Sequence, residues 1–198
     1  MLPDATLPVP ASLMTLLASF TPLFTALSFR TFTMLACGFL AQTGKRTVCG
    51  MLAGADLARC WSHDRAHFFF ARARWTPDEL GLAVARLVAA LLVPAGDPVT
   101  IAIDDTLSRA VERTVPFQLA CQAIATTWYA IAGHDPADVA DHRARAPWYT
   151  TKSQPSTADM LAKLRRILIA TKYRASHPDQ PTPEEINVIR LAWEDAAA

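Results

Sequence analysis

The chain has 198 residues, which is enough for one large domain or two small ones with a substantial core. Apolar residues make up 52% and charged residues 19%, and the net charge is only +1. This balance hides two basic blocks, residues 28–75 and 113–176, which alternate with acidic stretches. The overall charge therefore does not exclude a polyanionic partner.

Four cysteines fall on apolar stretches and include no C-x-x-C pair: Cys37, Cys49, Cys60 and Cys121. We expect reduced core thiols in a cytoplasmic protein, not a disulfide or a metal site. The N-terminus lacks the basic region of a signal peptide. Two uncharged runs, residues 5–29 and 114–133, are long enough to cross a membrane, but their proline, hydroxyl and glutamine residues favour buried helices instead. We therefore expect no membrane partner.

Helical periodicity dominates the first part of the chain. The apolar pattern predicts helices over residues 11–20, 28–41, 47–56 and 62–73, the last with Ser62 as its N-cap. The polar residues 43–46 separate the second helix from the third.

The run Thr76-Pro77-Asp78-Glu79 predicts the start of a fifth helix. It combines an N-cap threonine, proline at the first helical position and glutamate at the capping-box position. The helix is predicted to run to about Leu92 and to bury apolar residues at a spacing of three and four: Leu80, Val84, Leu87, Val88 and Leu91.

Residues 99–103, Val-Thr-Ile-Ala-Ile, predict a short strand that leads into Asp104 and Asp105. A strand that ends in carboxylates is typical of metal-dependent phosphoryl-transfer enzymes, where it places the first metal ligand. Adjacent side chains of a strand point to opposite faces, so only one of the two carboxylates would serve a metal. An ordinary turn followed by a helix cap explains the local spacing equally well. No second strand with an acidic end follows.

The remaining pattern is helical again. Helices are predicted over residues 115–132 and 136–145, from Ser156-x-x-Asp159 to about Tyr173, and after Thr182-Pro183-Glu184-Glu185. We therefore predict a mainly α fold with three parts. These are a helical N-terminal region (1–97), a short strand and junction (98–112), and a helical C-terminal region (113–198).

Two histidines and a set of basic residues are candidates for function. His63 and His67 have the i, i+4 spacing of zinc ligands, but the metalloprotease glutamate is missing and no third ligand is evident, which favours a surface or packing role. The basic residues are interleaved with aromatic ones between residues 45 and 75: Lys45, Arg46, Arg65, Arg72 and Arg74. Such a cluster suits contact with a phosphate backbone, although arginines on a helical surface are often simply solvated.

The chain resembles the DDE-type transposases of bacterial insertion sequences, in the branch whose first catalytic aspartate lies in an Ile/Val-Asp-Asp-Thr strand. Residues 42–52, 61–75 and 78–105 resemble the N-terminal region of the family, up to and including that strand. Residues 113–198, with Ala-Pro-Trp-Tyr-Thr-Thr-Lys at 146–152, resemble its extreme C-terminal region.

This resemblance implies an RNase H-like core, two divalent metal ions such as Mg²⁺, and three carboxylates that direct DNA cleavage and joining. Only the first carboxylate maps here, on Asp105 as catalytic residue and metal ligand, with Asp104 as the alternative. The second aspartate and the glutamate should lie where only residues 106–112 remain, and Glu112 has no surrounding motif. We therefore expect an internally deleted, catalytically inactive remnant that binds Mg²⁺ weakly or not at all.

The implied partner is DNA, namely the terminal repeats of the element, contacted through the basic residues between 45 and 75. An alternative is a helical fragment that self-associates and interferes with intact transposase through the helices at 115–132 and 157–173. A third hypothesis, an active nuclease that borrows carboxylates from another chain, is weakened because no copy has a second acidic strand.

Overall fold

The computed structural model describes residues 9–99, 113–148 and 150–176, and this part of the chain is helical and contains no strand. The predicted mainly α fold is therefore confirmed. The predicted strand cannot be compared, because residues 100–112, with Asp104 and Asp105, lie outside the described residues. The elements in chain order are α1 (Ala11–Ala18), η1 (Thr21–Leu23), α2 (Ala26–Ala41), α3 (Val48–Gly54), α4 (His63–Arg72), α5 (Pro77–Leu92), α6 (Thr114–Trp128), the π-helical turn η2 (Tyr129–Gly133), α7 (Asp138–Arg145) and α8 (Thr157–Ser176).

Capping hydrogen bonds fix where several helices begin. The Thr76 hydroxyl accepts from the Glu79 N–H, and the Glu79 carboxylate accepts from the Thr76 N–H, which is the predicted capping box of α5. Ser156 and Asp159 form the same reciprocal pair at the start of α8. Ser62 does precede α4, but its hydroxyl caps no backbone N–H. The Thr182 signature lies outside the described residues.

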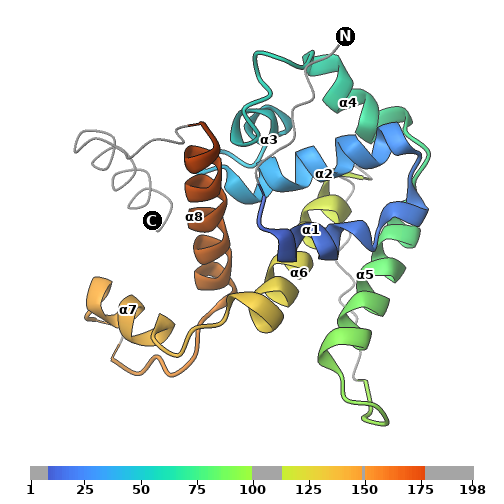
Figure 1. Cartoon of the computed structure of the whole chain (residues 1–198). Helices are drawn as coiled ribbons and strands as arrows, with labels where there is room; N and C mark the ends of the chain where they lie inside the picture. Colours follow the sequence, from blue (N-terminus) through green and yellow to red (C-terminus); the bar gives the residue numbers. More distant parts are fainter. Residues whose placement is uncertain (1–8, 100–112, 149, 177–198) are drawn as a thin grey trace.

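Helix α2 is the centre of the molecule (Figure 1). Residues 31–40 of this helix are all buried, because α3, α4, α6 and α8 all pack against it. The core continues into the second helical region: Phe117 of α6 makes an edge-to-face contact with Phe32 of α2 at 5.9 Å between ring centroids, and Leu164 of α8 is fully buried. One hydrophobic cluster thus contains side chains from both sides of residues 100–112.

Two cations of α8 tie this helix to the α2–α3 pair. Lys172 donates to the Gly54 carbonyl at 3.2 Å and pairs with the Asp56 carboxylate at 2.5 Å. Arg165 donates from Nε to the Leu40 carbonyl at 3.4 Å. Both cations thereby satisfy carbonyl groups at the C-terminal ends of helices, where the helix dipole favours positive charge.

Helices α2 and α3 approach each other through glycine. A Cβ atom added at Gly38 would lie 1.9 Å from the Met51 carbonyl oxygen, and one added at Gly54 would lie 2.2 Å from the Gly38 carbonyl oxygen. Neither position has room for a side chain, so these two glycines set the spacing between the two backbones.

Two expectations about burial are wrong. Leu80 is buried and Val84, Leu87 and Val88 are half-buried, but Leu91 is 44% exposed, because this end of α5 extends past its main neighbour α6 (Figure 1).

The expectation of four core thiols is wrong for two of them. Cys37 and Cys121 are core thiols as expected, whereas Cys49 and Cys60 are exposed. Cys49 lies on the outer side of the short helix α3, and Cys60 lies in the connection between α3 and α4.

Among the described residues, none of the helices combines the length and the apolarity that a membrane crossing requires.

Candidate nucleic-acid interface

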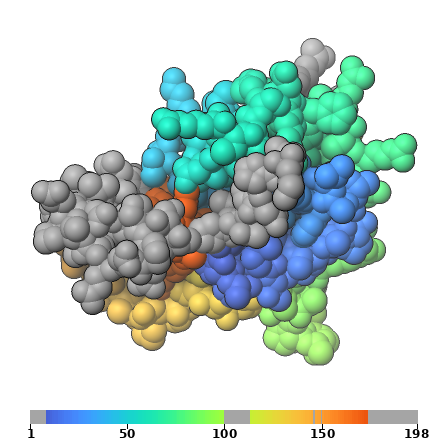
Figure 2. Space-filling model, turned by 45° about the horizontal axis from the view of Figure 1, so that its top comes forward, coloured from blue at the N-terminus to red at the C-terminus, as the bar shows by residue number. Residues whose placement is uncertain are grey.

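Four arginines line one pocket between the beginning of α2 and α4. Arg30 comes from α2, Arg65 and Arg72 from α4, and Arg74 from the connection to α5. The pocket has a volume of about 520 Å³, and none of its described lining residues is acidic. Figure 2 shows α4 beside the N-terminal helices on this side of the molecule. The pocket is therefore a concave, positively charged surface that favours an anionic group.

The spacing of α4 explains why basic and aromatic side chains meet here. Arg65, Phe68 and Arg72 follow one another at three and four residues, which places them on one face of a helix. The neighbouring Phe69 is buried and stacks on Trp75 at 5.3 Å between centroids, so it anchors α4 to the core. The outward residues of the same helix are then presented to the pocket.

Arg65 is held in place by an aromatic ring. Its guanidinium carbon lies 3.7 Å from the centroid of the Trp61 ring, the geometry of a cation–π contact. Burial, and then the nearby charge of Arg30, lower the pKa of Arg65 from its ordinary value, but a guanidinium remains protonated. Two like charges thus face one pocket, and a bound anion would relieve their repulsion.

Arg72 and Arg74 are exposed at the same pocket. Neither of them forms an ion pair within the described part of the chain. Their donors are therefore available to an external phosphate or carboxylate.

The other two predicted DNA-binding residues lie elsewhere. Lys45 and Arg46 belong to the loop between α2 and α3 and do not line the pocket. The Arg46 guanidinium lies over the Phe39 ring at 5.7 Å. The backbone carbonyl of Arg46 accepts a hydrogen bond from the side-chain amide of Gln118 at 3.3 Å. The structure thus brings Arg65, Arg72 and Arg74 together, leaves Lys45 and Arg46 apart from them, and adds Arg30. Arg30 was missed because it stands alone in an apolar helix.

The two histidines at i, i+4 meet a third polar side chain. His63 Nε2 lies 3.0 Å from Cys49 Sγ and 3.2 Å from His67 Nε2, so the cluster connects α3 to α4. No group of three His, Cys, Asp or Glu side chains within residues 9–99, 113–148 and 150–176 is arranged to hold a metal ion. Both histidines are exposed, so these contacts link α3 and α4 at the surface of the molecule.

The carboxylates expected to bind divalent metal ions lie in the junction between the two helical regions. The predicted ligand Asp105 and its alternative Asp104 lie outside the described residues, as does Glu112. The carboxylates that the structure does describe offer no site that fits the metal ions implied by the resemblance.

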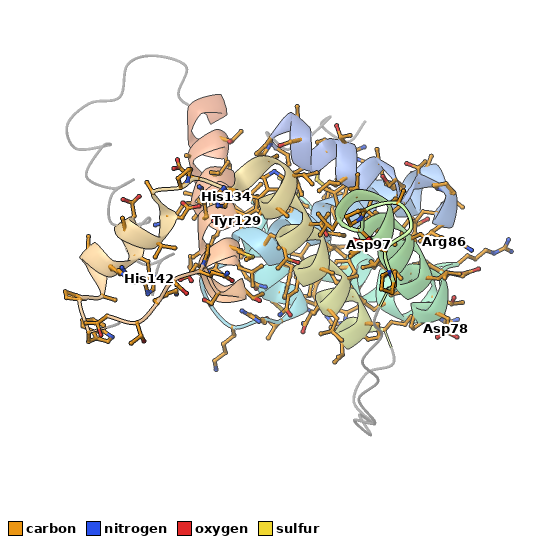
Figure 3. The ribbon with its side chains drawn as sticks, turned by 90° about the horizontal axis from the view of Figure 1, so that it is seen from below. Asp78, Arg86, Asp97, Tyr129, His134 and His142 are labelled. Atoms are coloured by element: carbon orange, nitrogen blue, oxygen red, sulfur yellow. The ribbon has the colours of Figure 1, made fainter. Side chains whose placement is uncertain are left out.

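A second polar cluster lies far from the arginines, where α7 and η2 meet α8. The Asp138 carboxylate accepts from the Tyr129 hydroxyl at 2.5 Å and from the Lys163 ammonium at 2.7 Å and 2.9 Å. Figure 3 shows Tyr129 and His134 together near α8, at the opposite side of the molecule from Asp78 on α5.

Asp159, in the first turn of α8, has a similar role. It contacts Lys152, Ser156 and His142, the last at 3.0 Å. Burial alone would raise the pKa of Asp159, but the hydrogen bonds from Lys152 and Ser156 and the charge of Lys152 together lower it to about 2. Each carboxylate is thus paired with a lysine, which indicates that this cluster stabilises the packing of α7.

Comparison with known families agrees with the resemblance of the N-terminal region to DDE-type transposases. The family model described as DDE superfamily endonuclease matches residues 19–116, about half of the chain. The matched segment contains the whole arginine-lined pocket as well as Asp104 and Asp105. Residues 19–116 therefore belong to the DDE superfamily endonucleases, a transposase-related family that acts on DNA and generally uses divalent metal ions. No curated protein and no solved structure matches the chain significantly.

Proposed function

We propose that this chain is an internally deleted DDE transposase that has lost catalysis and kept contact with DNA. The observation that carries the DNA contact is the convergence of four arginines on a pocket without acidic lining residues, inside the segment that matches the family. Arginine is well suited to this role because its planar guanidinium can bind phosphate oxygens in pairs.

The proposed loss of catalysis is supported by the order of the two resembling regions. The family match ends at residue 116, and the C-terminal resemblance begins at residue 113, which supports a deletion of the segment that would carry the second aspartate and the glutamate. Two-metal phosphoryl transfer needs several carboxylates to hold and neutralise the ions. Magnesium bound to Asp105 without them would be held weakly and in a poorly defined position.

The packing of the helices supports a remnant that still folds. The junction lies between α5 and α6, and these two helices pack on each other. Phe117 and Ile124 of α6 are buried in the same core as α2. A segment removed between α5 and α6 would therefore leave this helical body intact. A role on DNA places the protein in the cytoplasm, which suits its four free thiols.

The DNA contact is tested by a filter-binding titration with the terminal repeats of the element at two salt concentrations. We expect affinity to fall steeply with salt, and we expect the Arg72→Gln/Arg74→Gln double variant to lower the slope of log K against log salt by about two, because about one counterion is released per phosphate contact. Arg86→Gln is the matched control, since this exposed arginine of α5 does not line the pocket. Absence of binding at low salt, or an equal loss in the control, would contradict the proposal.

A second candidate, self-association, is favoured by one observation. Large apolar side chains are exposed on the neighbouring helices α5 and α6: Leu82, Leu91, Leu92, Val115 and Leu119. By contrast, α8 buries Leu161, Leu164 and Leu168 within its own chain. Of these two helices, α6 therefore offers more exposed apolar surface for self-association. Light scattering of the purified chain tests this candidate. We expect Leu119→Glu to dissociate an oligomer, and a monomer at every concentration would exclude it.

A further inference from the structure

We propose that the pocket between α2 and α4 receives an unpaired nucleotide of a DNA strand, with the base against Phe68 and the phosphate on the surrounding arginines. This inference rests on the proposed DNA binding and adds the form of DNA that is bound. It is carried by three features of the pocket, namely its size, its exposed apolar wall and its charge.

The size of the pocket exceeds what contact with a phosphate backbone requires. A volume of about 520 Å³ lies in the range of pockets that hold small organic ligands. An intact duplex presents phosphates on its outside and keeps its bases stacked inside. It can touch the rim of such a pocket, but it has nothing to insert. A nucleotide released from pairing has both a flat apolar part and an anionic part.

The wall of the pocket offers a surface for the base. Phe68 is 60% exposed and Leu27 is 75% exposed, and both line the pocket. The neighbouring Phe69 and Phe70 pack against other rings, but the Phe68 ring has no aromatic partner among the described residues. An exposed aromatic ring beside arginines is the arrangement with which proteins stack the bases of single-stranded nucleic acid.

The charge of the pocket selects an anionic occupant. Arg65 is fixed over Trp61, Arg30 lies close enough to affect it electrostatically, and Arg72 and Arg74 line the same opening. None of the described residues that line the pocket is acidic, so its described lining carries positive charge only. The combination of an aromatic surface with several guanidinium groups fits a nucleotide better than an acidic peptide, which would use the charge and leave the ring exposed.

The test uses fluorescence anisotropy of the full chain with three labelled probes of equal length. They are an oligothymidylate, the same strand with abasic sites, and the matched duplex. We expect the oligothymidylate to bind about tenfold more tightly than the abasic strand, because stacking of a single base commonly supplies this much affinity. We expect the duplex to bind more weakly than the oligothymidylate as well.

Phe68→Ala is the variant that tests the ring itself. It should lower affinity for the oligothymidylate about tenfold and leave affinity for the duplex unchanged. Since the side chain is mostly exposed, the thermal unfolding midpoint should not change. Trp148→Ala, which removes another exposed aromatic residue that does not line the pocket, should change neither affinity.

The possible failures can be told apart. Equal affinity for the oligothymidylate and the abasic strand would show phosphate contact alone and overturn the inference, and this comparison needs no variant. An unchanged oligothymidylate affinity in Phe68→Ala would overturn it as well. Absence of binding to all three probes at low salt would instead overturn the proposed DNA contact itself.

Discussion

Arg65 and Arg72 stand seven positions apart on one helix, and this spacing alone predicts that they share a face. Arg74 follows closely enough to join them. Arg30 could not be assigned to the same surface from the sequence, because only the packing of α2 against α4 brings it there. For the same reason, the sequence groups Lys45 and Arg46 with this cluster, although the fold places them in the loop between α2 and α3. Neighbours along one helix are predictable, whereas neighbours across two helices depend on the fold.

A residue-scale prediction concerns the stability of the chain in acid. The pKa of Asp159 is about 2 in the folded chain and ordinarily 3.8, so its contribution is complete above about pH 4 and is lost as the pH falls through 2. Because solvent screens this partly exposed carboxylate, we expect the shift to contribute about 1 kcal/mol of unfolding free energy. We expect Asp159→Asn to remove this part of the pH dependence in urea unfolding between pH 5 and pH 2.

The control for this prediction is Asp141→Asn. Asp141 is an exposed aspartate of α7, so its replacement removes one carboxylate without disturbing the contacts of Lys152 and Ser156. It should leave the pH dependence nearly unchanged. Identical acid profiles for the two variants would show that the ion pairs of Asp159 contribute nothing measurable.

At the scale of elements, helix starts were the most predictable features. Thr76 with Glu79 and Ser156 with Asp159 signal their helices through contacts three residues apart, and both signals lie within the local sequence. The exposure of Leu91 was not predictable in this way, because periodicity indicates which face is apolar but not where the neighbouring helix ends. The contact between Cys49 and His63 likewise needed the crossing of α3 and α4.

The glycines offer a matched pair of predictions about elements. Gly38→Ala should destabilise the chain by about 3 kcal/mol, because the new Cβ would overlap the Met51 carbonyl group and force α2 and α3 apart. Gly81→Ala in α5 should stabilise it by about 1 kcal/mol, because no atom lies within 4 Å of the new Cβ and alanine favours the helix. Denaturant unfolding measures both changes. Equal effects from the two substitutions would contradict the close packing of α2 and α3.

At the scale of the whole molecule, the two resembling regions share one core. Phe32 of α2, Phe117 of α6 and Leu164 of α8 all belong to the same hydrophobic cluster. The sequence predicted a helical region on each side of residues 98–112, but the shared core depends on long-range packing that periodicity does not encode. This packing supplies a physical reason for the proposed remnant to remain folded.

The central claim, DNA contact without catalysis, is tested most directly by one assay on the whole chain. Supercoiled DNA carrying the terminal repeats is incubated with the protein and Mg²⁺, and each sample is examined both for a mobility shift and for nicked product. We predict that the DNA is bound and that nicking does not exceed the level of the Asp105→Ala variant. Metal-dependent nicking that disappears in Asp105→Ala would contradict the claim.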